Sequence, residues 1–134
     1  MTKKKSNLPE SYFFKKVVEI PMYGGNFIII FSNDPVKIAK VVNALPSQLI
    51  NIYAQTFHGF MYGGKESFAV IFNFWDTYAI TIGTITHEVT HAGNRLLLSR
   101  EFEPDWINDE AEAYLKSWMA DEVQDFIQQC GLAQ

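Results

Sequence analysis

Two histidines and a glutamate stand together in the segment His87-Glu88-Val89-Thr90-His91, which has the spacing HExxH. Residues four apart on a helix lie on the same face one turn apart, so both imidazoles can reach one zinc ion. Glu88 points about 100° away from His87 around such a helix. From there its carboxylate can take a proton from a zinc-activated water and return it to a leaving amine. The pattern predicts a hydrolytic site with one zinc ion per chain.

A catalytic zinc site usually has three protein ligands and one open position, so a third ligand is expected. Glu110 and Glu112 lie in an acidic segment about twenty residues downstream. Two positions apart on a helix correspond to about 200° of rotation, so only one of them can face the metal. His58 lies upstream in a predicted strand. We interpret it as a polar residue facing solvent or a groove, with a contact to substrate or to an oxyanion as the functional alternative.

The HExxH helix, followed by a helix that bears glutamate, resembles the gluzincin group of metallopeptidases. The sequence pattern Asp-Glu-x-x-Ala-Tyr-Leu at residues 109–115 is also similar to the corresponding segment of small zincin-like proteins encoded by bacteriophages. The resemblance covers roughly residues 68–126. It implies a zinc metallopeptidase in which Glu110 is the third ligand, Glu112 is the fallback and Tyr114 stabilises an oxyanion. The alternative for Tyr114 is an ordinary core aromatic. Leu97 stands six residues beyond His91, which excludes the metzincin pattern, where a third histidine occupies that position.

The HExxH segment lies within the strongest helical pattern of the chain. Apolar residues recur there at spacings of three and four, namely Ile82, Ile85, Val89, Ala92 and Leu96. A second stripe, roughly 120° away around the helix, contains Thr84, His87, His91 and Arg95. One side is expected to pack on the core, and the other needs a cover from a different element. This pattern runs from Tyr78 to Leu98, but Gly83 costs about 1 kcal/mol inside a helix, so we predict that the helix itself starts at Thr84.

The remaining elements are predicted from β-branched runs, turns and caps. Strands are expected at 13–20, 27–31, 51–62 and 67–74, and further helices at 35–45 and from 106 or 107 to about 129. The strand at 13–20 is expected near an edge and the strand at 27–31 at the centre. The last two strands should form a hairpin with an open outer edge. The order ββαββαα predicts a minimal zincin-like α+β fold, with a mixed sheet packed against an active-site helix and a glutamate helix.

Length and composition predict a single domain at residues 11–134, preceded by a disordered lead-in at residues 1–10. The formal net charge is -4, with 11 Lys and Arg against 15 Asp and Glu, so no electrostatic footprint for nucleic acid is present. No apolar run approaches the length of a membrane span or a signal peptide, so a cytoplasmic protein is expected. A single cysteine, Cys130, excludes a multi-thiolate zinc site within the chain.

Two functions are consistent with these patterns. In the first, the protein is a zinc peptidase that binds a peptide or protein substrate along the outer strand of the hairpin, and it acts in the infected bacterium or virion if it is encoded by a phage. In the second, it is a structural or interaction protein, such as a virion component, with a zinc-stabilised or decayed HExxH site. A catalytic site leaves one zinc position open, whereas a structural site is closed by a fourth ligand.

Overall fold

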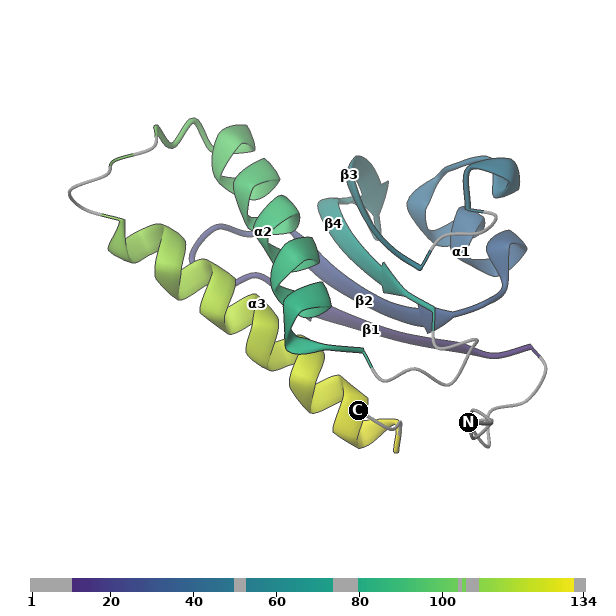
Figure 1. Ribbon diagram of the computed structural model, residues 1–134. Coiled ribbons are helices and arrows are strands. Elements are labelled where there is room, and N and C mark those ends of the chain that lie inside the picture. Colours follow the sequence, from purple (N-terminus) through teal and green to yellow (C-terminus); the bar gives the residue numbers. More distant parts are fainter. Residues whose placement is uncertain (1–10, 50–52, 74–79, 104, 106–108, 132–134) are drawn as a thin grey trace.

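The computed structural model describes residues 11–49, 53–73, 80–103, 105 and 109–131 (Figure 1). The elements within these residues are β1 Phe13–Glu19, β2 Asn26–Ser32, α1 Pro35–Val42, the 3-10 turn η1 Pro46–Leu49, β3 Ala54–Tyr62, β4 Lys65–Phe72, α2 Ile82–Ser99 and α3 Glu110–Gln129. The protein is an α+β structure with a mixed sheet, as predicted. Apart from the added turn η1, the elements follow one another in the predicted order.

The strands form one sheet in the order β1-β2-β4-β3. At its centre β2 and β4 pair in parallel, and β1 and β3 pair antiparallel on the two outer sides. All seven residues of β2 are buried, because a central strand covered on both faces has no solvent side. The predictions of an edge strand at 13–20, a central strand at 27–31 and an edge in the hairpin are confirmed.

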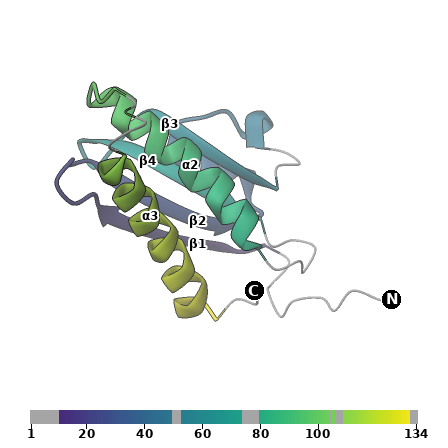
Figure 2. The same ribbon diagram turned by 60° about the vertical axis from the view of Figure 1, so that its left-hand side comes forward.

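Helices cover both faces of the sheet and form two separate hydrophobic cores. On one face, Phe27, Ile29 and Phe31 of β2 pack with buried residues of α2 and α3. On the other face, Ile28 and Ile30 pack with residues of α1 and η1. Figure 2 shows α2 and α3 side by side across the first face. This three-layer arrangement holds the HExxH helix directly against the sheet.

Helix α2 begins at Ile82 because Thr81 caps it. The Thr81 hydroxyl accepts a hydrogen bond of 3.1 Å from the Thr84 amide. Such a cap satisfies an amide that has no partner within the helix, and it offsets the low helix propensity of Gly83 in the first turn. The predicted start at Thr84 is therefore wrong by two residues. The predicted start of α3 at 106 or 107 lies outside the described residues, within which α3 begins at Glu110.

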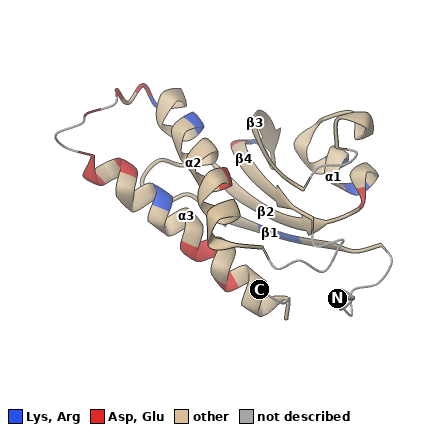
Figure 3. Cartoon of the chain, in the orientation of Figure 1, with Lys and Arg blue, Asp and Glu red and all other residues tan. Residues whose placement is uncertain are grey.

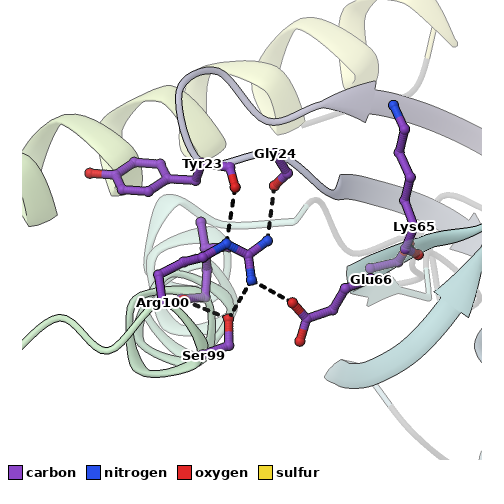
Figure 4. A network of polar contacts seen from close by, with 8 residues as sticks. Tyr23, Gly24, Lys65, Glu66, Ser99 and Arg100 are labelled. Atoms are coloured by element: carbon purple, nitrogen blue, oxygen red, sulfur yellow. Dashed lines mark hydrogen bonds and ion pairs between the residues drawn. The ribbon is translucent and has the colours of Figure 1, made fainter.

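Arg100 ties the C-terminal end of α2 to the sheet (Figure 4). Its guanidinium donates to the carbonyl oxygens of Tyr23 at 3.0 Å and Gly24 at 3.3 Å, in the turn between β1 and β2. It also pairs with the carboxylate of Glu66 on β4 at 2.5 Å. Gly25 lies against this cluster with φ of +84°, and a Cβ added there would stand 2.7 Å from the Glu66 carbonyl oxygen. These contacts fix the position of α2 over the sheet.

Charged side chains are unevenly distributed over the fold. Figure 3 shows acidic residues along α3, which carries five Asp and Glu against one lysine. The outer surface of α3 is therefore predominantly acidic. None of the described helices is long and apolar enough to span a bilayer. The predicted lead-in at residues 1–10 lies outside the described residues.

Candidate metal centre

His87 and His91 lie one turn apart on α2, and both line a cavity that they share with β3. Their Nε2 atoms are 3.2 Å apart, and their rings are nearly perpendicular at 82°. Two nitrogens that bind one tetrahedral zinc at about 2.0 to 2.1 Å are themselves about 3.3 Å apart. The two imidazoles are within hydrogen-bond distance of each other, and the same separation is close to that of two ligands on one zinc ion. Both side chains are exposed, so an ion can reach them from solvent.

Glu88 is buried, with only 5% of its surface exposed. Its Oε1 accepts a hydrogen bond of 2.8 Å from the Thr56 hydroxyl on β3. Its Oε2 lies 4.0 Å from Nε2 of His87. A buried carboxylate needs hydrogen-bond partners to offset the loss of water, and Thr56 supplies one of them. One carboxylate oxygen is thus fixed on the sheet, and the other lies near the histidine pair.

Thr56 is the residue of this site that the sequence analysis missed. Its hydroxyl lies 2.8 Å from the Glu88 carboxylate and 3.1 Å from the Glu88 carbonyl oxygen, and it can donate to one of them at a time. The sequence does indicate that Thr56 lies on the same face of β3 as His58, because side chains two residues apart on a strand point to the same side. The alternation does not show which helix covers this face of β3, so Glu88 could not be identified as the partner of Thr56.

The cavity between α2 and β3 has a volume of ≈ 300 Å³. Its lining combines four residues of the strand with one stripe of the helix: Ala54, Gln55, Thr56, His58, His87, Glu88, His91 and Arg95. The strand supplies the cover that the polar stripe of α2 was predicted to need. The structure also brings His58 to the same cavity as the HExxH residues, which agrees with a groove-facing position.

The structure does not bring Glu110 or Tyr114 to this cavity. Glu110 is exposed at the first position of α3, and Tyr114, one turn later, is 74% exposed. Glu112, the fallback ligand, pairs with Lys116 on its own helix. Lys116 also donates to Asn94 of α2 at 2.7 Å. The acidic segment is therefore used in part for contacts between the two helices.

The face on which α3 packs explains this separation. A Cβ added at Gly93 would lie 2.8 Å from Cγ of Lys116, so Gly93 marks the side of α2 that meets α3. His91 is two residues earlier, which corresponds to about 200° of rotation around the helix. Gly93 thus faces α3, whereas the histidines line the cavity with β3 on a different side of α2. Sequence spacing could not show this, because it fixes positions around α2 but not the side on which the next helix packs.

A complete ligand set is not assembled in the described part of the chain, where no three His, Cys, Asp or Glu side chains lie close enough to hold a metal ion. The histidine pair and the nearby Glu88 are in place, and a third ligand is not. Comparison of the chain with protein families, with curated proteins and with solved structures finds no match.

Proposed function

We propose that the protein is a zinc-dependent hydrolase of zincin-like architecture, and that it cleaves peptide bonds. One observation carries the proposal: the Nε2 atoms of His87 and His91 are 3.2 Å apart, the separation of two ligands on one zinc ion. A buried carboxylate 4.0 Å from one of them, on Glu88, adds the base that hydrolysis needs. Two solvated histidines on a helix surface would not require such a carboxylate beside them.

His87 and His91 would hold the metal, and two residues are candidates for the third position. Glu110 is the candidate that the family resemblance implies, but it lies outside the cavity. His58 lies inside it and carries the third imidazole of the chain. As the side chains stand, no three ligands are close enough, so His58 joins the pair only after a change of its side-chain conformation. We favour His58 because it already lines the cavity.

When bound, zinc supplies a Lewis acid and lowers the pKa of a water molecule toward about 7. Glu88 would accept a proton from the attacking water, and the oxygen of that water would add to the scissile carbonyl carbon. As the C–N bond breaks, Glu88 returns the proton to the leaving amine. Thr56 holds Oε1 of this carboxylate, which leaves Oε2 for the proton transfers. Glu88 thus starts and ends the cycle as a carboxylate.

A peptide would bind along β3. This strand is an edge of the sheet and lines the cavity with Ala54, Gln55, Thr56 and His58. An extended peptide can add to such an edge through main-chain hydrogen bonds. Its scissile bond would then lie over α2, beside the histidine pair. The rival function, a structural protein with a closed or decayed site, requires neither an edge strand nor a base at this place.

Metal content is the first test. Elemental analysis of the purified protein should give about one zinc per chain, and His87→Ala should lose it. Thr86→Ala is a matched control, because Thr86 is exposed beside His87 and does not line the cavity. His58→Ala and Glu110→Ala decide the third ligand, since only the true ligand should weaken zinc binding. A chain without zinc after reconstitution would overturn the proposal.

A further inference from the structure

Arg95 lies one turn after His91 on α2 and lines the same cavity as the HExxH residues. Among the residues that line this cavity it is the one with a permanent positive charge. Four residues along a helix correspond to a rise of about 6 Å. The cation is thus offset from the histidine pair by a fixed step along the helix, on the side toward the C-terminal end of α2.

No hydrogen bond or ion pair occupies Arg95 within the described residues. The chain has only two arginines, and the other one, Arg100, is fully engaged with Glu66 and two backbone carbonyls (Figure 4). Glu88, the one carboxylate that lines the cavity, is engaged by Thr56 and faces His87. An arginine that is exposed and has no anionic partner among the described residues therefore lines the cavity.

We propose that Arg95 binds a carboxylate of the substrate, and that the substrates are peptides with a free C-terminal carboxylate two residues beyond the scissile bond. A guanidinium recognises a carboxylate through two parallel charge-assisted hydrogen bonds. An extended peptide advances about 3.3 Å per residue, so two residues match the helical step of about 6 Å. This inference rests on the proposed hydrolase function and narrows it to removal of a short C-terminal fragment.

The carboxylate can come from the chain terminus or from an acidic side chain, and three probe peptides separate these sources. The first is acetyl-Ala-Phe-Ala-Ala with a free carboxylate, the second is the same peptide as its amide, and the third is an amide with aspartate as the penultimate residue. Terminal recognition predicts cleavage of the first peptide with kcat/KM about ten- to hundredfold above both amides. Equal rates for the acid and its amide, or a preference for the aspartate peptide, would overturn the proposal.

Arg95→Gln provides the test at the residue. We expect it to raise KM for the free acid about ten- to hundredfold and to leave the amide unchanged, so that the preference disappears. Arg95→Lys should recover only part of it, since an ammonium cannot make the bidentate contact. Zinc content should be the same in both variants as in the wild type. A retained preference in Arg95→Gln would assign carboxylate recognition to another group.

A binding measurement separates failure of this inference from failure of the hydrolase proposal. Calorimetry with Glu88→Gln, in the presence and absence of zinc, should show the acid binding about tenfold or more tightly than its amide, and the added change Arg95→Gln should abolish the difference. If the chain binds no zinc but this difference persists, the hydrolase proposal fails and the carboxylate site stands. If the acid and amide bind alike, or neither binds, the carboxylate site is wrong whatever the zinc content.

Discussion

The Thr56 hydroxyl and the Glu88 carboxylate lie 2.8 Å apart across the boundary between β3 and α2. This contact joins the edge strand on which a substrate would lie to the residue proposed as the base. Because Glu88 is buried, the orientation of its carboxylate is set by this contact rather than by solvent. A shift of β3 relative to α2 would therefore also move Oε2 of Glu88, the oxygen proposed to carry the proton.

Glu88→Gln should abolish hydrolysis without removing zinc. Glutamine has the same shape and its amide oxygen can still accept from Thr56, but it cannot take up a proton from water. We expect kcat to fall at least 10²- to 10⁴-fold, the usual contribution of a general base. Asp125→Asn, on the exposed surface of α3, makes the same change of charge and should leave kcat unaltered. Substantial residual turnover in Glu88→Gln would remove Glu88 from the mechanism.

Thr56→Val should lower both stability and turnover. Valine replaces the hydroxyl with a methyl group and leaves the buried carboxylate of Glu88 without this donor, at a cost of about 1 to 3 kcal/mol in the free energy of unfolding. Because the carboxylate is no longer oriented, kcat should fall while KM for the peptide stays the same. Thr56→Ser retains the hydroxyl and should restore kcat. If serine and valine behave alike in denaturant unfolding and in kinetics, the hydroxyl has no role.

Gly25→Ala should destabilise the fold more than Gly24→Ala. Both glycines have positive φ, +84° and +72°, so alanine is strained at either position. Only at Gly25 does the new Cβ also meet a backbone atom, the Glu66 carbonyl oxygen at 2.7 Å, whereas nothing lies within 4 Å at Gly24. We expect a loss of about 1 kcal/mol for Gly24→Ala and about 2 to 4 kcal/mol for Gly25→Ala. Equal losses of unfolding free energy in urea would show that the turn between β1 and β2 can shift enough to accommodate the new Cβ at Gly25.

Arg100→Met should cost about 1.5 to 3 kcal/mol of unfolding free energy, because it leaves the Tyr23 and Gly24 carbonyls and the Glu66 carboxylate without their donor. Arg95→Met makes the same chemical change at an exposed position with no partner in the described residues, and it should change stability by less than about 0.5 kcal/mol. Thermal unfolding of the two variants gives the comparison. A similar loss in both would contradict the role assigned to Arg100.

Cys130 should react slowly with alkylating reagents. Burial raises the pKa of its thiol, and the Lys16 ammonium offsets part of this effect. Since the thiolate is the reactive form, the pH at which alkylation by iodoacetamide reaches half of its limiting rate should be higher in the folded chain than in the chain unfolded by guanidinium. Lys16→Gln should move that pH still higher. The folded state also favours the protonated thiol, so stability declines slightly as pH rises through the pKa of the unfolded thiol.

The pattern of apolar residues along the chain predicted an element well where burial of those residues in the core determines its structure. The uninterrupted apolar run at Phe27–Phe31 reports burial on both faces, and it is the central strand β2. The start of α2 was misplaced because the penalty for Gly83 was weighed without the cap that Thr81 provides. Helix propensity adds up the preferences of individual residues, and the single capping hydrogen bond with Thr81 was sufficient to move the start of α2.

The candidate site was predicted in part: residues brought together by the geometry of one helix could be predicted, and residues brought together by tertiary packing could not. The pairing of His87 with His91 follows from helical geometry alone, so their proximity could be predicted. The partner of Glu88 and the residues across the cavity depend on which strand covers α2, and this is a tertiary choice. Glu110 illustrates the same limit, because sequence spacing does not record that α3 packs on the Gly93 side of α2 while the histidines line the cavity with β3.

The register of β3 shifts between His58 and Phe60, where Gly59 has φ of +74°. A bulge of this kind bends and twists an outer strand, so its free amides and carbonyls no longer form one flat row. A second copy of the protein that approached this edge could pair along only part of its length, which opposes the growth of intermolecular sheets. A short flexible peptide can follow the bend where a rigid strand of another folded molecule cannot. The same irregularity thus protects the protein from aggregation while leaving its edge open to small extended ligands.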